Sequence, residues 1–369
     1  VEVGDGTTSR TVTVRQGESI TNAGTWRTFA NTDVRGVFAA PDERFVNTGT
    51  IEVLAGLGFP DEADMDTYLV VDGPGTVDVV TGELNIDIGT ATTGWIPDVA
   101  TDAVLNATFT EPISGLFDMT GSGTVAWTGT ITSGGPVDLA FEPGEWQPAI
   151  TQWNSTPTNT ITNTGHLPIT TTNTTIGTGF TNTGIVELAD RILFVRGGET
   201  VVNLGTVLLG DGSDLRGQAG SGMDEVLQND GVVATTADAV NTSITELDVA
   251  GTGTVRASSG RLYHDPSSID GIGNSELAGN VWEVTAVLDL DFSVRTNGAT
   301  IAVTGGGSLE SWLTQNDGLL IVSDGASTTL GSSTLTNDGV VVLGPQGTLT
   351  IDGDFTNSAT AVSYTHLTL

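Results

Sequence analysis

The sequence predicts an all-β fold, a parallel β-helix (solenoid) with about 22 residues in each coil. A short motif, Asn-x-Gly followed by an alternating apolar segment, recurs along the chain, as in NTGTIEV from Asn47, NTGIVEL from Asn182 and NDGVVVL from Asn337. Strand-forming Thr and Val dominate together with turn-forming Gly, Asn and Asp. No segment shows the long apolar pattern of period 3.6 that a helical repeat requires.

The spacing of this motif sets the length of the repeat. Consecutive copies lie 19 to 26 residues apart, except for spacings of 42, 48 and 65 residues, which fit two, two and three units. Periods of 20 to 50 residues are typical of solenoids, propellers and arrays. Propeller blades need about 40 residues or more, and Leu is too sparse for a leucine-rich repeat. A coil of two or three short strands remains. The copies begin at Asn22, Asn47, Gly73, Gly121, Asn163, Asn182, Asn203, Asn229, Gly251, Asn316 and Asn337.

The segment from Leu335 to Asn357 illustrates one predicted coil. A strand over 339–343 leads into a corner at 344–347, where Pro and Gly are expected to supply fixed and left-handed backbone angles. A second strand over 348–351 alternates polar and apolar residues, and Phe355 is expected to return to the core. The motif Asn residues of stacked coils should form a ladder with a spacing of about 4.8 Å.

The composition excludes several classes of function. The formal net charge is -34 and all 11 basic residues are Arg, so a Lys Schiff base and a Walker-type phosphate loop are excluded. The acidic balance argues against nucleic acid as a partner. The absence of Cys excludes disulfides, thiol nucleophiles and thiolate metal sites. No apolar run approaches the roughly 18 residues of a transmembrane segment.

The motif is weakest between Gly89 and Pro157, where Pro residues interrupt it and four of the 7 Trp gather. Irregular insertions in a solenoid map to loops on one face, which is often the binding face. Trp rings beside an acid can stack on a sugar and hydrogen-bond to it. The alternative interpretation is that these Trp fill wide coils or seal a loop against the solenoid. The predicted glycan-binding residues are Trp95, Trp127, Glu145, Trp146 and Trp153.

Two further segments invite a chemical interpretation. In the second irregular region, about 257–281, His264 and Asp265 are adjacent; neighbouring residues on a strand point to opposite faces, so they should not form a catalytic dyad. The densest acidic run, from Asp61 to Asp66, has carboxylates that suit calcium but lacks the spacing of an EF-hand loop. We therefore expect a solvated loop there, with weak calcium binding as the alternative. No catalytic residue, cofactor or metal site is predicted.

The repeats FTNTGIVELAD, LTNDGVVVLGPQGTLTIDGDFTN and FVNTGTIEVLAG resemble those of large bacterial secreted right-handed β-helix proteins. Autotransporter passengers and filamentous-haemagglutinin-like adhesins are familiar members. The resemblance implies export, an extracellular or cell-surface location, and adhesion or scaffolding, with glycans or a host or neighbouring cell surface as partners. It transfers no catalytic residue.

Residues 1–361 are expected to form a single repeat array, with irregular coils at about 89–157 and 257–281. The last eight residues, VSYTHLTL from Val362 to Leu369, differ from the rest and look like a translated transposon-end sequencing adapter. They are expected to be a non-native tail. The first residue is Val1 and no signal peptide is seen, so the chain is expected to be a fragment of a longer protein.

The sequence thus predicts an extracellular structural or adhesive repeat protein that presents a rigid acidic rod and performs no catalysis. One alternative is a polysaccharide-active β-helix enzyme, a lyase or a glycoside hydrolase. A hydrolase needs a pair of carboxylates at roughly 5 to 10 Å, and fold alone does not decide the question. Another alternative is a surface-layer or stalk module.

Overall fold

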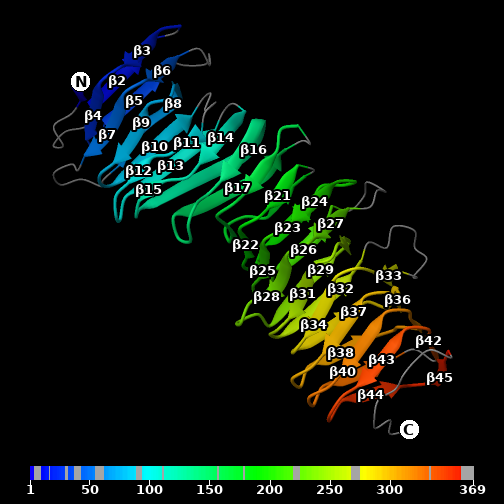
Figure 1. Ribbon diagram of the computed structural model, residues 1–369. Coiled ribbons are helices and arrows are strands. Elements are labelled where there is room, and N and C mark those ends of the chain that lie inside the picture. The colour runs from blue at the N-terminus through cyan, green and yellow to red at the C-terminus, as the bar shows by residue number, and fades with distance from the viewer. Residues whose placement is uncertain are drawn as a thin grey trace. The chain divides into compact units, whose positions relative to one another are not determined.

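The computed structural model contains only strands, turns and loops in the part of the chain that it describes (Figure 1). It shows a parallel β-solenoid of about 14 turns, with coils about 21 residues apart, which confirms the predicted fold and period. Residue contacts divide the chain into two compact units, Val1–Thr172 and Asn173–Leu369. The predicted tail, 362–369, lies outside the described residues. These are all residues except 4–9, 16, 30–31, 37–42, 55–61, 89–93, 110–111, 156–157, 178, 219–224, 267–274, 332–333 and 359–369.

Each coil of the second unit contains three short strands. A representative coil consists of β22 (Ile185–Leu188), β23 (Ile192–Val195) and β24 (Thr200–Asn203). Each strand pairs in parallel with its counterpart one coil later, and these are β25 (Thr206–Leu209), β26 (Asp214–Gly217) and β27 (Val226–Asn229). The stacked coils therefore form three parallel sheets, which we call the first, second and third faces.

The three faces of the second unit continue through its described coils. The first face adds β28 (Val232–Thr235), β31 (Thr254–Ala257), β34 (Val281–Val284), β37 (Thr300–Val303), β40 (Leu319–Val322) and β43 (Val340–Leu343). The second face comprises β20 (Thr174–Ile176), β23, β26, β29 (Asn241–Thr245), β32 (Arg261–Asp265), β35 (Val287–Leu290), β38 (Ser308–Ser311), β41 (Ser327–Leu330) and β44 (Thr348–Ile351). The third face comprises β21 (Phe180–Asn182), β24, β27 and β30 (Asp248–Ala250), and then β33 (Ser275–Leu277), β36 (Val294–Asn297), β39 (Gln315–Asn316), β42 (Thr334–Asn337) and β45 (Asp354–Asn357).

The first unit also has three faces, and its strands range from two residues to the 16 residues of β16 (Thr124–Leu139). Its first face is β1 (Glu2–Val3), β4 (Thr25–Phe29), β7 (Thr50–Leu54), β9 (Thr76–Val79), β12 (Asp98–Val99) and β15 (Thr120–Gly121). Its second face is β2 (Arg10–Val14), β5 (Thr32–Gly36), β8 (Glu62–Asp72), β10 (Glu83–Ile88), β13 (Val104–Phe109), β16 (Thr124–Leu139) and β17 (Trp146–Asn154). Its third face includes β3 (Ser19–Asn22), β6 (Arg44–Asn47), β11 (Gly94–Trp95), β14 (Ile113–Phe117) and β18 (Ile161–Asn163), while β19 (His166–Ile169) follows β18.

Alternation along each strand separates core from surface. In β25, Val207 and Leu209 are buried while Thr206 and Leu208 are half-buried outward positions, and most strands of the second unit repeat this pattern. The predicted coil at 335–357 follows it too: β43, the corner and β44 lie where expected. Phe355 pairs with the buried Leu335 but is itself exposed, since it lies in the last described coil. Stacking thus continues one apolar interior from coil to coil.

The predicted asparagine ladder is present at the corner between the third and first faces. In the second unit, Nδ2 of Asn182 donates to Oδ1 of Asn203 at 2.8 Å, and Nδ2 of Asn203 donates to Oδ1 of Asn229 at 2.7 Å. The second N–H of each amide donates to a main-chain carbonyl of the next coil, that of Thr206 at 3.0 Å and that of Val232 at 3.1 Å. Every polar atom of the Asn203 side chain is therefore bonded while fully buried, as buried amides require.

The ladder also includes two residues outside the motif, Asn297 and Asn280. Asn297 donates to Asn316 at 2.7 Å, although its segment reads Asn-Gly-Ala rather than Asn-x-Gly. At Gly251 the ladder residue is missing, and Asn229 instead bonds to Asn280 of the following coil at 2.9 Å. A Cβ on Gly251 would lie 2.3 Å from the carbonyl oxygen of Asn229. The ladder therefore tolerates a coil without Asn where glycine leaves room.

The expectation of left-handed glycines in the corner at 344–347 is wrong, and the Gly of the Asn-x-Gly motif serves close approach between coils. In the illustrated corner, Gln346 has a φ of 60°, while Gly344 and Gly347 have no positive φ. A Cβ on Gly231 would lie 2.1 Å from the carbonyl oxygen of Gly205 in the preceding coil. Only glycine lets these two corners stack at strand spacing.

Gly231→Ala is expected to lower the free energy of unfolding of the second unit by about 1 to 3 kcal/mol, because the added methyl overpacks the corner. Chemical denaturation followed by circular dichroism measures this change. Gly24→Ala is the matched control, since it occupies the same motif position and its Cβ would meet no atom within 4 Å. Equal effects of the two substitutions would contradict the close-approach explanation.

Candidate functional site

The predicted glycan-binding tryptophans come together in the core of the first unit. Trp127 makes edge-to-face contacts with Phe109 at 4.7 Å, with Phe117 at 5.4 Å and with Trp146 at 5.2 Å between ring centroids. Trp95 packs on Phe109, and Trp153 packs on Trp146. All four Trp are buried, so their ring faces contact protein. Stacking on a sugar is not supported by this arrangement, and the packing fits the alternative interpretation that the rings fill wide coils.

Glu145, the acid of the predicted glycan site, closes a local turn. Its Oε2 accepts a hydrogen bond from the backbone N–H of Glu142 at 2.8 Å. The adjacent Trp146 starts β17 and faces inward. Between β10 and β17 the described residues form paired strands, with shifts of register, rather than long insertions. The Pro and Trp residues here thus mark wide coils.

The exposed tryptophan is Trp312, which the sequence interpretation missed. It is 48% exposed, whereas the other six Trp of the chain are at most 8% exposed. Trp312 follows β38, and its neighbours Ser311 and Leu313 are buried. The alternation of Leu309, Ser311 and Leu313 was a usable signal, because it places residue 312 on the outside.

Trp312 belongs to a row of residues at the corner that follows the second face. Thr245 pairs with Asp265, His264 pairs with Leu290, and Ser311 pairs with Leu330 in successive strands. Continued by one residue, this register places Asp265, Asp291 and Trp312 above one another in successive coils, while Glu246 and Phe292 each stand one position further along their own coils. We call this row the acid–aromatic corner; it consists of Glu246, Asp265, Asp291, Phe292 and Trp312.

Main-chain hydrogen bonds fix the acidic part of the corner. The N–H of Glu246 donates to the carbonyl of Asp265 at 2.8 Å, and the N–H of Asp291 donates to the carbonyl of His264 at 2.9 Å. The crowding has an electrostatic consequence. Burial, together with the nearby carboxylates of Asp291 and Glu246, raises the pKa of Asp265 to about 6. This carboxyl consequently titrates close to neutral pH.

The aromatic part of the corner is supported by the next coil. A Cβ placed on Gly331 would lie 3.5 Å from each of Cδ2, Cε2 and Cε3 of Trp312. Such equal distances put Gly331 under one ring face, while the 48% exposure of the side chain leaves ring surface open to solvent. Nη1 of Arg295 donates to the carbonyl oxygen of Trp312 at 3.2 Å and holds this corner.

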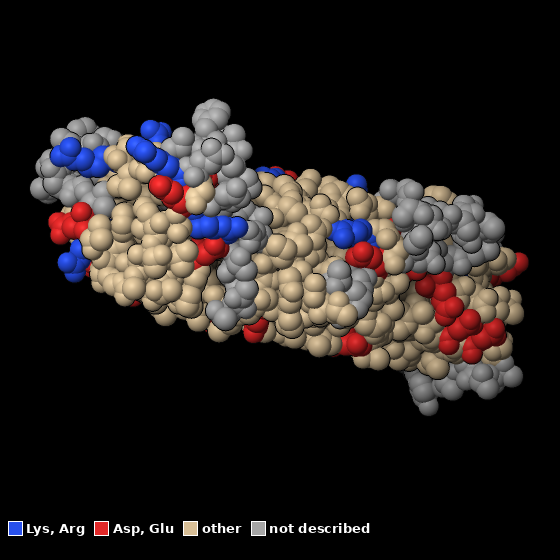
Figure 2. All heavy atoms as spheres, turned by 90° about the horizontal axis from the view of Figure 1, so that it is seen from above, with Lys and Arg blue, Asp and Glu red and all other residues tan. Residues whose placement is uncertain are grey.

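Charged and aromatic side chains continue on the adjoining outer surface of the second face. The hydroxyl of Tyr263 donates to Oδ2 of Asp291 at 2.7 Å. Partial burial of the Tyr263 side chain, together with this hydrogen bond, raises the pKa of Tyr263. Arg261 donates through Nε to Asp289 at 3.0 Å and through Nη2 to Glu310 at 2.9 Å. Figure 2 shows acidic side chains gathering toward the C-terminal coils, where no Arg follows Arg295.

His264 and Asp265 point to opposite sides of β32, as their adjacency predicts. His264 is buried, its ring tilts against that of Trp282 at a centroid distance of 5.1 Å, and its Nδ1 lies 3.2 Å from the carbonyl oxygen of Ile244. Burial lowers the pKa of His264 to about 4. The side chain is a neutral core residue and does not form a dyad with Asp265.

These two groups should oppose each other between pH 6.5 and 4. As pH falls, the unfolded chain protonates His264 before the folded state does, which lowers stability by up to about 3 kcal/mol. Asp265, by contrast, is protonated first in the folded state, because its pKa is raised from 3.8 to about 6, and this adds stability. Asp265→Asn removes only the second effect.

When the pH is lowered from 7 to 4.5, the melting temperature of Asp265→Asn is therefore expected to fall further than that of the parent protein. Thermal unfolding at the two pH values measures the difference. Asp354→Asn, an exposed acid in β45, serves as the control and should behave like the parent. The same change in melting temperature in all three proteins would show that protonation of Asp265 does not stabilise the folded state.

Metal ligands do not cluster in the part of the chain that the structure describes, where no group of three or more His, Asp or Glu side chains could hold an ion. The acidic run from Asp61 to Asp66, the expected place of weak calcium binding, lies outside the residues whose side chains are described.

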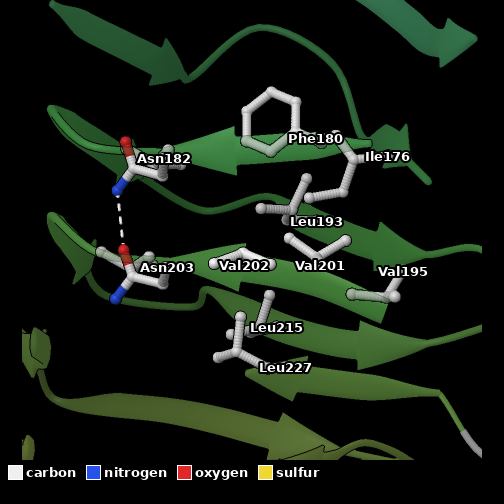
Figure 3. A pocket seen from close by; sticks show the side chains of 12 residues that line it. Ile176, Phe180, Asn182, Leu193, Val195, Val201, Val202, Asn203, Leu215 and Leu227 are labelled. Atoms are coloured by element: carbon white, nitrogen blue, oxygen red, sulfur yellow. Dashed lines mark hydrogen bonds between the residues drawn. The ribbon is translucent and has the colours of Figure 1, made fainter. Parts of the chain in front are cut away.

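A small cavity in the interior of the second unit is not a ligand site. Its volume is about 10 Å³, which is at most the room of one water molecule. Figure 3 shows that apolar side chains such as Phe180, Leu193 and Val201 line it, beside the bonded amides of Asn182 and Asn203. It is a gap in packing between stacked coils.

Comparisons with protein-family models, with curated proteins and with solved structures find no match for this chain. Across the described residues, no helix has the length and apolarity needed to cross a lipid bilayer.

Proposed function

We propose that this chain is an extracellular structural and adhesive repeat protein. Its stacked coils would supply stiffness, and its outer faces would supply a repeated acidic surface. The observation that carries the proposal is repetition: the same three-strand coil and the same buried amide ladder recur in the second unit from Asn182 to Asn357. The likeness of the repeats to those of secreted adhesins supports the location.

Adhesion is tested with the protein coupled to beads and washed over bacterial cells and over surfaces coated with polysaccharide. Retention above that of beads coupled to albumin is the expected result. Retention that survives 0.5 M NaCl would indicate binding by more than surface charge, because salt at that concentration screens exposed charges. Absence of retention on every surface, for this chain and for a longer form of the protein, would overturn the adhesive role.

A polysaccharide-active enzyme is the second candidate, and one observation favours it. Asp265, whose pKa is about 6, lies beside Asp291 and Glu246. A carboxylic acid that titrates near neutral pH beside a second carboxyl group is the arrangement by which glycoside hydrolases divide acid and base roles.

Turnover decides between the two candidates. Release of reducing ends or unsaturated products from neutral and acidic polysaccharides would be measured with the purified protein. Activity that Asp265→Asn abolishes and Asp354→Asn preserves would establish the enzyme. Retained adhesion without product would leave the structural and adhesive function as proposed.

A further inference from the structure

We propose that the acid–aromatic corner binds a neutral polysaccharide, with Trp312 and Phe292 stacked on sugar rings and the carboxylates of Asp265 and Asp291 accepting hydrogen bonds from sugar hydroxyls. This inference rests on the proposed adhesive function and names its site and its ligand class. The ligand would run along the row, across successive coils.

Trp312 provides the main stacking surface. Trp combines a large apolar ring with an N–H donor and is enriched at surfaces that contact a partner. Here the ring is also held in place, since Gly331 lies under one face and Arg295 anchors the main chain of Trp312. A ring fixed before binding loses little conformational entropy when the ligand arrives.

Phe292 extends this surface into the preceding coil. Its side chain is 62% exposed and lies in a turn that the N–H of Ser293 closes by donating to Oδ1 of Asp291 at 2.9 Å. Neighbouring coils are separated by about 4.8 Å, which is close to the length of one sugar ring. Two aromatic side chains in consecutive coils can thus meet consecutive rings of one chain.

The surrounding charges favour a neutral ligand over an acidic one. Three carboxylates, those of Glu246, Asp265 and Asp291, lie in the same row. The two nearby guanidinium groups are already engaged, that of Arg261 with Asp289 and Glu310 and that of Arg295 with the Trp312 carbonyl. An acidic sugar would meet uncompensated negative charge, whereas hydroxyl groups find acceptors.

A protein partner fits this surface less well. Stable protein interfaces bury roughly 1,000 Å² or more with an apolar centre. At the corner the exposed apolar surface comes from Phe292 and Trp312, and carboxylates flank it. Such a narrow aromatic strip beside hydrogen-bond acceptors suits a thin chain of hydroxyl-bearing rings.

Tryptophan fluorescence offers a direct test, because Trp312 is the exposed one among the 7 Trp. Cellohexaose, maltohexaose and xylohexaose are the neutral probes, and hexagalacturonate is the acidic probe. At least one neutral probe is expected to shift the emission and to protect it from acrylamide, with hexagalacturonate about tenfold weaker or more. Trp312→Ala is expected to weaken binding, measured by calorimetry, by about tenfold or more.

The controls separate failure of the site from failure of the adhesive function. Leu204→Ala, which removes an exposed apolar side chain from a different corner, should bind like the parent protein. Unchanged binding by Trp312→Ala, equal binding of hexagalacturonate, or no response to any neutral probe would each overturn the proposed site. If the bead assay still shows adhesion after such a result, the adhesive function stands without this site.

Discussion

Trp127→Ala is expected to lower the free energy of unfolding of the first unit by about 3 to 5 kcal/mol, as large-to-small changes of buried aromatic residues do. The Trp127 ring is fully buried and contacts Phe109, Phe141 and Trp146 at centroid distances of 4.7, 5.6 and 5.2 Å. Removal of the ring opens a cavity among the remaining aromatic side chains. This cavity cannot close unless strands on two faces move.

Urea denaturation followed by near-ultraviolet circular dichroism measures the effect, since most Trp of the chain lie in this unit. Leu116→Ala in β14 is the control; this side chain is 39% exposed, and its loss should cost less than about 1 kcal/mol. A Trp127→Ala protein as stable as the control would show that the aromatic cluster contributes little to this unit. It would also reopen the possibility that the rings serve a ligand.

Asn203→Ala is expected to destabilise the second unit by about 3 kcal/mol or more, because it leaves several buried polar groups without partners. The substitution removes the acceptor of the Asn182 amide and both donors, to Asn229 and to the carbonyl of Val232. The corner is fully buried, so the groups left without partners lie away from bulk water.

Leu204→Ala is the matched control, since it changes the next residue, which is 52% exposed. Denaturation of both variants under the same conditions gives the comparison. Hydrogen exchange adds a local measure: the amides of Leu204 and Gly205 donate to the Asn182 carbonyl at 2.8 and 3.0 Å, and they should exchange faster in Asn203→Ala. Equal stability of the two variants would mean that the amide ladder does not contribute to the free energy of unfolding.

The fold was predictable because every coil must meet the same steric demand. A corner that stacks on the previous corner needs Gly at the point of closest approach and a buried amide beside it, so the sequence repeats both. Asn297 was missed because Ala299 stands where the motif has Gly. The copies that begin with Gly were not equivalent either: the one at Gly251 precedes β31 on the first face, and the one at Gly121 precedes β16 on the second.

The candidate site was less predictable, because it depends on which side of a strand each residue faces. In the region from β13 to β17, long strands with register shifts turn Trp127, Trp146 and Trp153 inward, and no local pattern records those shifts. Trp312 lies after a short, regular strand, where alternation alone indicates its outward direction. Clustering of Trp in the sequence therefore predicted exposure less well than the position of a single Trp in the alternation of buried and exposed residues along its strand.

The direction of the amide ladder bears on the dipole moment of the stacked coils. Each Asn side chain donates toward the C-terminal coil, and its orientation is fixed because its second N–H meets a carbonyl, as that of Asn182 meets Thr206. At the same corner the main-chain N–H groups of Leu204 and Gly205 donate the opposite way, to the carbonyl of Asn182. The two sets of dipoles oppose each other. An α-helix sums its dipoles into a partial charge at each end, whereas at this corner the side-chain amides offset part of the moment that the main-chain N–H groups of each added coil contribute.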